Sequence, residues 1–174
     1  NMRAALDEAA AAIQRCNHPF GAVLTDSNGT VLVRAQNTVI TESDPTCHAE
    51  TNLVRAAVRD PRKLDLKSCT VVTSTEPCPM CAGAIYWAGI GRVVYGCSGS
   101  TLGEISGEEL GVPCRAIFQS GKLHSVDVLG FDTMVHLQTA DAGAQAGHEH
   151  PLHAEAVAMH RKFWSNWDGG HFGK

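Results

Sequence analysis

The feature that most constrains the fold is a pair of short motifs that must meet in space. The first motif is His48-Ala49-Glu50, and the second is Pro77-Cys78-Pro79-Met80-Cys81. Each is predicted to lie at the start of a helix, and a buried strand over residues 69–74 is predicted between them. One imidazole and two thiolates are good ligands for a single Zn²⁺ in tetrahedral geometry. The two helix starts are therefore expected to lie side by side at the carboxyl edge of a sheet.

The number of metal ligands indicates what such a site can do. Three protein ligands, His48, Cys78 and Cys81, leave one position of the metal open, where water can bind and lose a proton near neutral pH. Glu50 is near enough to this position to carry protons. Hydrolytic deamination of an amidine-like ring carbon needs both groups, because the ring nitrogen and the departing ammonia each receive a proton. H-x-E combined with P-C-x-x-C is a known signature of zinc deaminases.

Two other classes of protein are compatible with parts of this pattern. A zinc-stabilised binding module without turnover would fill all four metal positions with protein, and Cys47 is its candidate fourth ligand. An adjacent residue on a helix turn points away from His48, however, and Glu50 would then have no task. A thiol redox protein would use Cys78 and Cys81 but would leave the other two residues unexplained. The pattern therefore favours an enzyme.

Hydrophobic periodicity and turn signals predict an α/β domain. A helix is expected over residues 3–15, followed by antiparallel strands over 20–25 and 30–36 around the Asn28-Gly29 turn. The later elements are expected to be a helix from Asp44-Pro45 to Asp60-Pro61, a strand over 69–74, a helix over 79–88, a strand over 92–97, a short helix over 103–110, a strand over 125–129 and a helix over 151–164. Because strands alternate with helices, a sheet between helix layers is expected, and the hairpin makes that sheet mixed.

The chain is predicted to form one main domain over residues 1–138. Residues 139–150 lack periodicity and are interpreted as a flexible linker. Residues 151–174 are interpreted as a C-terminal helix with an aromatic tail, which is expected to pack on the same or a neighbouring subunit. The histidines of the His148–His153 segment are interpreted as part of a solvated linker rather than as a second metal site.

Composition and charge restrict the class of partner. Lys and Arg total 14 against 18 Asp and Glu, which gives a formal net charge of −4 and not the positive field typical of nucleic-acid binders. A small substrate is favoured, and nucleic acid is not expected. No run approaches the roughly 18 apolar residues of a membrane span. The seven cysteines fit reduced thiols better than a secreted disulfide framework, so a cytoplasmic protein is predicted.

From Phe20 to Gly96 the chain resembles the cytidine deaminase superfamily, in particular the branch that contains guanine, guanosine and tRNA adenosine deaminases. The resemblance is carried by Pro19 to Val23, Asn37, Asp44 to Glu50, and Thr75 to Ala88. It implies a three-layer α/β/α sandwich with a mixed five-stranded sheet whose last strands are parallel. It also implies one zinc ion per subunit and a homodimer or larger assembly. Separately, the long segment before the last helix would allow that helix to be swapped onto a neighbouring subunit.

The resemblance further implies which residues surround the substrate. Asn37 would hydrogen-bond the heterocycle, and Phe20 and Trp87 would line the pocket. Ala49 and Pro77, which lie within the two metal motifs, are further predicted substrate contacts.

The ring that is deaminated is less constrained by the sequence. Glu108 or Glu109 could supply a carboxylate to the ring N–H groups of guanine, although residues 98–114 do not reproduce the Asp-rich stretch associated with guanine recognition. The predicted substrate is a purine base or nucleoside, with guanine or guanosine favoured. Cytosine or cytidine deamination and tRNA adenosine deamination are the alternatives.

Overall fold

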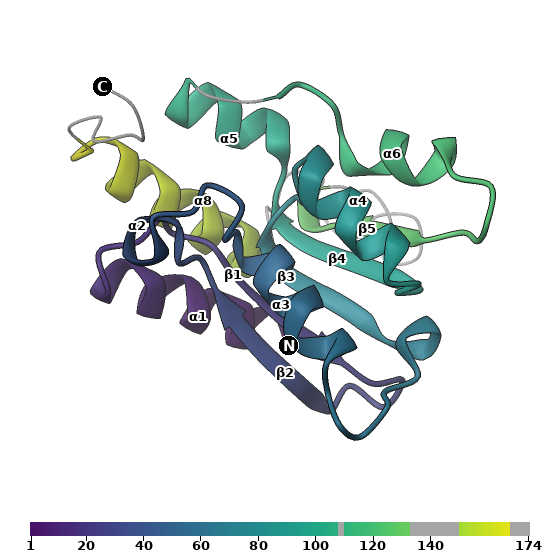
Figure 1. Cartoon of the computed structure of the whole chain (residues 1–174). Coiled ribbons are helices and arrows are strands. Elements are labelled where there is room, and N and C mark those ends of the chain that lie inside the picture. The colour runs from purple at the N-terminus through teal and green to yellow at the C-terminus, as the bar shows by residue number, and fades with distance from the viewer. Residues whose placement is uncertain (108–109, 133–149, 168–174) are drawn as a thin grey trace.

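The computed structural model describes residues 1–107, 110–132 and 150–167. The strands in these residues are β1 (Gly21–Thr25), β2 (Val31–Gln36), β3 (Thr70–Thr75), β4 (Arg92–Cys97) and β5 (Asp127–Gly130). They form one five-stranded sheet in the order β2-β1-β3-β4-β5 (Figure 1). Strand β1 pairs antiparallel with both β2 and β3, whereas β3, β4 and β5 are parallel. The predicted mixed five-stranded sheet is therefore confirmed, including its parallel last strands.

Helices cover both faces of the sheet and complete the predicted three-layer sandwich (Figure 1). One face packs against α3 (Ala49–Val58), α4 (Pro79–Trp87) and α6 (Cys114–Ser120). The other face packs against α1 (Met2–Gln14) and α8 (Pro151–Trp164). Further helical elements are α2 (Val39–Glu42), a 3-10 turn (Leu66–Ser68) and α5 (Gly99–Ser106). Because side chains of a strand alternate between faces, Val71 belongs to the first core and Val72 to the second.

Two predicted helix starts are wrong by several residues. The helix expected at Asp44-Pro45 begins at Ala49, because the Asp44 carboxylate accepts the backbone N–H of Thr46 at 2.7 Å and closes a turn instead. The helix expected over 103–110 is α5, which begins at Gly99. Its start is fixed by Ser98, whose hydroxyl oxygen accepts the N–H of Thr101 at 3.2 Å. The short helices α2 and α6 were not predicted.

Helix α8 begins at Pro151, as predicted, and packs on the sheet of its own chain. Its residues Ala156 and Val157 lie in the same apolar core as Leu6 of α1. The predicted linker falls largely on residues 133–149, which lie outside the described residues, as does the tail after 167. No helix in the described part of the chain is long and apolar enough to cross a membrane.

The interpretation of the late histidines as solvated is wrong for His153. The His150 ring nitrogen Nδ1 accepts the N–H of Leu152 and caps α8. His153 is buried, and its Nδ1 lies 2.7 Å from the Gly96 carbonyl oxygen. Both residues therefore help to place α8, and His148 lies outside the described residues.

His160 of α8 provides a pH-dependent contribution to stability. It is buried, and burial lowers the pKa of its imidazole to about 4 from the ordinary value of 6.5. Between these two pH values the unfolded chain binds more protons than the folded chain, so the free energy of unfolding falls as the pH falls through this window. Going from pH 7 to pH 4.5, wild type should lose about 2 kcal/mol more than His160→Gln, which does not titrate.

Urea unfolding of both proteins at the two pH values, with matched metal content, checks this expectation. The same pH dependence in both proteins would contradict it.

Candidate active site

Three side chains that could hold a metal ion meet where α3 and α4 begin. His48 is the N-cap of α3, Cys78 is the N-cap of α4, and Cys81 lies in the first turn of α4. Their ligand atoms all lie within 4.8 Å of one another, and Cys78 Sγ is 3.7 Å from His48 Nδ1. Among the described residues this is the one such cluster of His, Cys, Asp and Glu. One nitrogen and two sulfurs at this spacing suit a zinc ion that all three can contact.

A hydrogen bond between the two cysteines shifts their pKa values in opposite directions. A hydrogen bond from Cys81 to Cys78 lowers the pKa of Cys78 to about 4, and a weaker contribution comes from His48. The pKa of Cys81 is raised because this thiol retains the proton and is buried. The hydrogen bond to Cys78 also raises the pKa of His48. A bound cation would take the place of that proton, because metals bind thiolates.

A buried carboxyl group lies beside the three ligands. Glu50, on the first turn of α3, is only 4% exposed. Burial raises its pKa, and the negative charge on Cys78 raises it further. The hydroxyl of Thr73 on β3 donates a hydrogen bond of 2.8 Å to Glu50 Oε1. The site therefore contains a carboxyl group that is held in place and shielded from bulk water.

Two of the predicted substrate residues lie together at the same edge of the sheet. Asn37 directly follows β2, and its backbone N–H donates to the carbonyl of Phe20, which directly precedes β1, at 2.9 Å. The Asn37 side chain is 1% exposed, and its Oδ1 accepts the N–H of Val39. Its Nδ2 has no hydrogen-bond partner in the described part of the chain. A buried donor of this kind requires an acceptor, which a bound ligand could supply.

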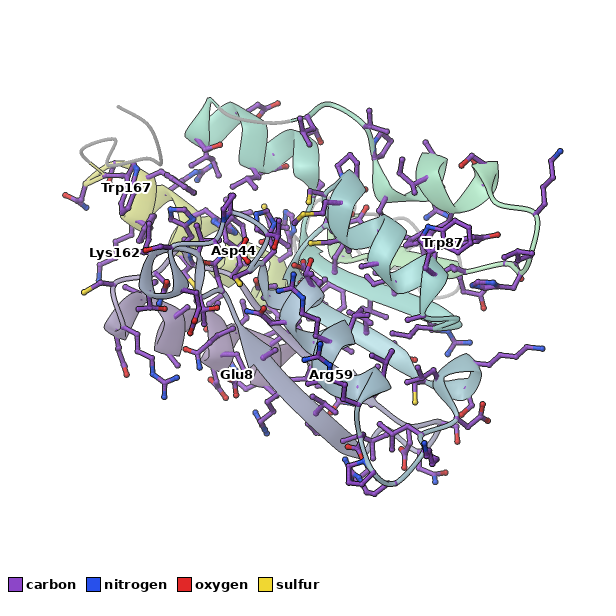
Figure 2. The ribbon with its side chains drawn as sticks, viewed as in Figure 1. Glu8, Asp44, Arg59, Trp87, Lys162 and Trp167 are labelled. Carbon is purple, nitrogen blue, oxygen red and sulfur yellow. The ribbon has the colours of Figure 1, made fainter. Side chains whose placement is uncertain are left out.

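The other predicted site residues fall into three groups. Ala49 and Pro77 are buried within the metal motifs. Trp87 lies at the other end of α4 from the cysteines, is 77% exposed and contacts Tyr86 (Figure 2). Because a helix rises about 1.5 Å per residue, the structure does not bring Trp87 to the metal ligands of its own chain. Glu108 and Glu109 lie outside the described residues.

Three residues around the site were not singled out from the sequence. Thr73 holds Glu50, and the hydroxyl of Thr51 lies 3.3 Å from Cys81 Sγ. Glu76 accepts the backbone N–H groups of Gly99 at 2.9 Å and Cys114 at 3.0 Å, so it fastens the cysteine loop to the starts of α5 and α6. One sequence signal bears on Thr73. Because side chains alternate along a strand, Thr73 and Thr75 are expected on the same face of the sheet, but the sequence does not show which helices cover that face.

This fold and this site define a zinc-type deaminase. Residues 1–97 match the family described as the cytidine and deoxycytidylate deaminase zinc-binding region, and the chain belongs to this family.

Relatives in the family act on different rings. A probable cytosine deaminase of Schizosaccharomyces pombe is 36% identical over 163 residues, which cover 88% of this chain and 82% of the relative. A guanine deaminase of Bacillus subtilis is 47% identical over 77 residues, which cover 44% of this chain and about half (49%) of the relative.

Solved structures show the same architecture. A structure from a study of tRNA:A34 deaminases has a TM-score of 0.59 at 32% identity and covers 74% of this chain and 95% of that one. A guanine deaminase of Nitrosomonas europaea has a TM-score of 0.72 at 22% identity, over 94% of this chain and 82% of that one. The second likeness is one of fold alone.

The zinc content of variants should distinguish the proposed ligands from the buried neighbour Cys47. The Sγ atom of Cys47 lies 3.6 Å from Arg55 Nη1. His48→Ala and Cys81→Ala should each weaken zinc binding by at least about a hundredfold, because a direct ligand is lost. Cys47→Ala should retain zinc like wild type. Plasma emission spectrometry of dialysed proteins measures this, and zinc loss in Cys47→Ala equal to that in His48→Ala would contradict the assigned ligands.

Proposed function

We propose that this protein hydrolytically deaminates a purine base or nucleoside in a zinc-dependent reaction, with guanine or guanosine as the favoured substrate. The observation that carries the proposal is the buried carboxyl group of Glu50 beside His48, Cys78 and Cys81. This arrangement supplies both a metal centre and a proton carrier, which is what removal of an exocyclic amine requires.

The metal and the protein residues have separate tasks in this reaction. Zinc held by His48, Cys78 and Cys81 would supply the Lewis acidity that activates water as a nucleophile. Glu50 accepts the protons that the attacking water gives up and delivers them first to the ring nitrogen and then to the departing amine, which leaves as ammonia. The hydrogen bond from Thr73 engages Oε1 of Glu50 and so leaves Oε2 for proton transfer.

The ring would be bound at the edge of the sheet where β1 begins. Nδ2 of Asn37, which has no partner among the described residues, can donate to an acceptor on the ring, and the half-buried Phe20 can pack on its face. Neither residue carries a charge, which suits a neutral heterocycle. We include Ala49 and Pro77 as contacts because they lie within the metal motifs.

Cytosine is the second candidate ring. The relative named as a probable cytosine deaminase matches 88% of this chain, which is the observation that favours it. A tRNA substrate is less favoured, because the net charge of −4 offers little attraction for a polyanion. A homodimer and a cytoplasmic location stay predictions.

Ammonia release from guanine, guanosine, cytosine, cytidine, adenine, adenosine and a tRNA anticodon stem-loop tests the proposal. Fully zinc-loaded protein should show a kcat/KM for guanine or guanosine at least about tenfold above the others. The highest value for cytosine would establish the second candidate instead. The absence of ammonia from every substrate would contradict deamination.

Replacement of Glu50 should separate metal binding from catalysis. In Glu50→Ala, zinc content should stay at the wild-type level while kcat falls by about a thousandfold, because proton transfer is lost and the ligands remain. Glu42→Ala, which changes an exposed carboxylate on α2, is the control and should retain activity. Wild-type turnover in Glu50→Ala would rule out the proposed proton carrier.

The contact between Thr73 and Glu50 predicts a smaller effect on the same step. Thr73→Val should lower kcat about tenfold with little change in KM, because the carboxyl group loses the hydrogen bond that orients it. Thr73→Ser retains the hydroxyl and should restore most of kcat. Steady-state kinetics of the two variants checks this, and equal kcat values for Val and Ser would show that the hydrogen bond is not used.

A further inference from the structure

Helix α8 meets the edge of the sheet through one buried histidine. His160 is 1% exposed, and its Nε2 lies 2.7 Å from the hydroxyl oxygen of Thr75, the last residue of β3. Its ring also packs against Phe20, with ring centroids 5.2 Å apart. Otherwise α8 covers the face of the sheet opposite α3 and α4. His160 is therefore the point at which this helix reaches the edge that carries the site.

Both partners of His160 belong to segments that build the site. Thr75 lies three residues before the metal ligand Cys78, at the end of the same strand that places Thr73. Phe20 is the proposed wall of the substrate pocket, and its carbonyl accepts the backbone N–H of Asn37. A single side chain of α8 thus contacts both the segment that leads to the metal and the segment that would face the ring.

The chemistry of His160 is not that of an ordinary core residue. Burial lowers the pKa of its imidazole to about 4, so the ring is neutral at physiological pH. In the described part of the chain, Nδ1 of His160 has no hydrogen-bond partner. A buried polar atom without a partner is destabilising, and an apolar residue of similar size would avoid this cost. The presence of histidine here favours a role other than core packing.

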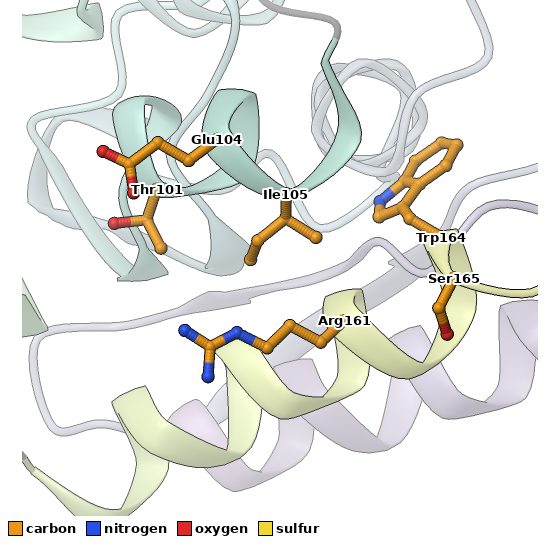
Figure 3. Close-up of a pocket in the computed structure, with 6 residues that line it drawn as sticks. All are labelled: Thr101, Glu104, Ile105, Arg161, Trp164 and Ser165. Atoms are coloured by element: carbon orange, nitrogen blue, oxygen red, sulfur yellow. The ribbon is translucent and has the colours of Figure 1, made fainter.

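The packing around the end of α8 shows what holds it in place. Helix α5 packs against α8. Between α5 and the last turns of α8 lies a hollow of about 440 Å³. Figure 3 shows the residues that line it. It is lined by Thr101, Glu104, Ile105, Arg161, Trp164 and Ser165. On its other side α8 packs against the segment before β1, where the His18 ring contacts Trp164 and Trp167. Contacts with His18, Phe20 and Thr75 therefore add to the packing against α5 in positioning this end of the helix.

We propose that His160 is a positioning residue for the substrate pocket, which acts by holding Thr75 and Phe20 in place. The inference rests on the function proposed above and assigns α8 a part in substrate recognition. Because Phe20 would contact the ring both before and during the reaction, loss of this support weakens binding in the ground state and the transition state alike. The effect is therefore expected in KM rather than in kcat.

Two substitutions of His160 distinguish its hydrogen bond from its volume. His160→Leu should raise KM about tenfold, leave kcat within about twofold of wild type and leave zinc content unchanged. The amide of His160→Gln can reach the Thr75 hydroxyl and should keep KM within about threefold of wild type. These assays use the substrate for which wild type has the highest kcat/KM. Circular dichroism verifies that both variants are folded.

His153 offers a matched control on the same helix. It is also buried, but its Nδ1 faces the Gly96 carbonyl oxygen and not the site. His153→Leu should lower thermal stability without changing KM. Thr75→Val should raise KM about as much as His160→Leu does. The double variant that combines the two substitutions should have a KM no higher than that of either single variant, because all three variants lose the same interaction.

An unchanged KM in His160→Leu, or an equal rise in His153→Leu, would overturn the inference. If zinc-loaded wild type releases no ammonia from any ring, the proposed function fails separately. In that case, calorimetric titration with guanine compares the binding affinity of His160→Leu with that of wild type and does not depend on turnover. Binding about tenfold weaker in His160→Leu than in wild type supports the positioning role, whereas equal affinity, or no binding to either protein, overturns it.

Discussion

Glu50 and the three metal-binding side chains occupy one small, largely dry volume between the first turns of α3 and α4. Charge in such a volume is costly unless it is compensated, and the structure shows that cost as raised pKa values for Glu50 and Cys81. A cation among His48, Cys78 and Cys81 would compensate it. The arrangement of the surrounding elements follows from the need to bring these groups together.

The sheet brings them together because of the direction of its strands. Strand β1 runs antiparallel to β3, so the residues before β1 and the residues after β3 meet at one edge. Phe20 and Asn37 thereby join the edge that leads to Cys78. Helix α8 reaches the same edge from the opposite layer through His160 and Thr75. The site is thus built from both helix layers and not only from the two helices that carry the ligands.

The sequence predicted the fold class and the meeting of His48, Cys78 and Cys81, because both depend on local patterns, namely alternating elements and motifs at helix starts. It placed the start of α3 too early, because Asp44 closes a turn instead of capping the helix. It placed the start of α5 too late, because Ser98, which caps this helix, cannot be told from a turn serine by its sequence alone. It did not identify Thr73 or His160. Their roles depend on pairs of residues far apart in the chain, Thr73 with Glu50 and His160 with Thr75, which no periodicity reveals.

The central claim is that a metal bound here has two cysteine ligands, one histidine ligand and an open position beside Glu50. X-ray absorption spectroscopy at the zinc edge on the purified protein tests it most directly. The account predicts two sulfur ligands and two lighter ligands, one of which is displaced when a substrate analogue is added. Three sulfur ligands would make Cys47 part of a closed structural site, and that result would contradict the account.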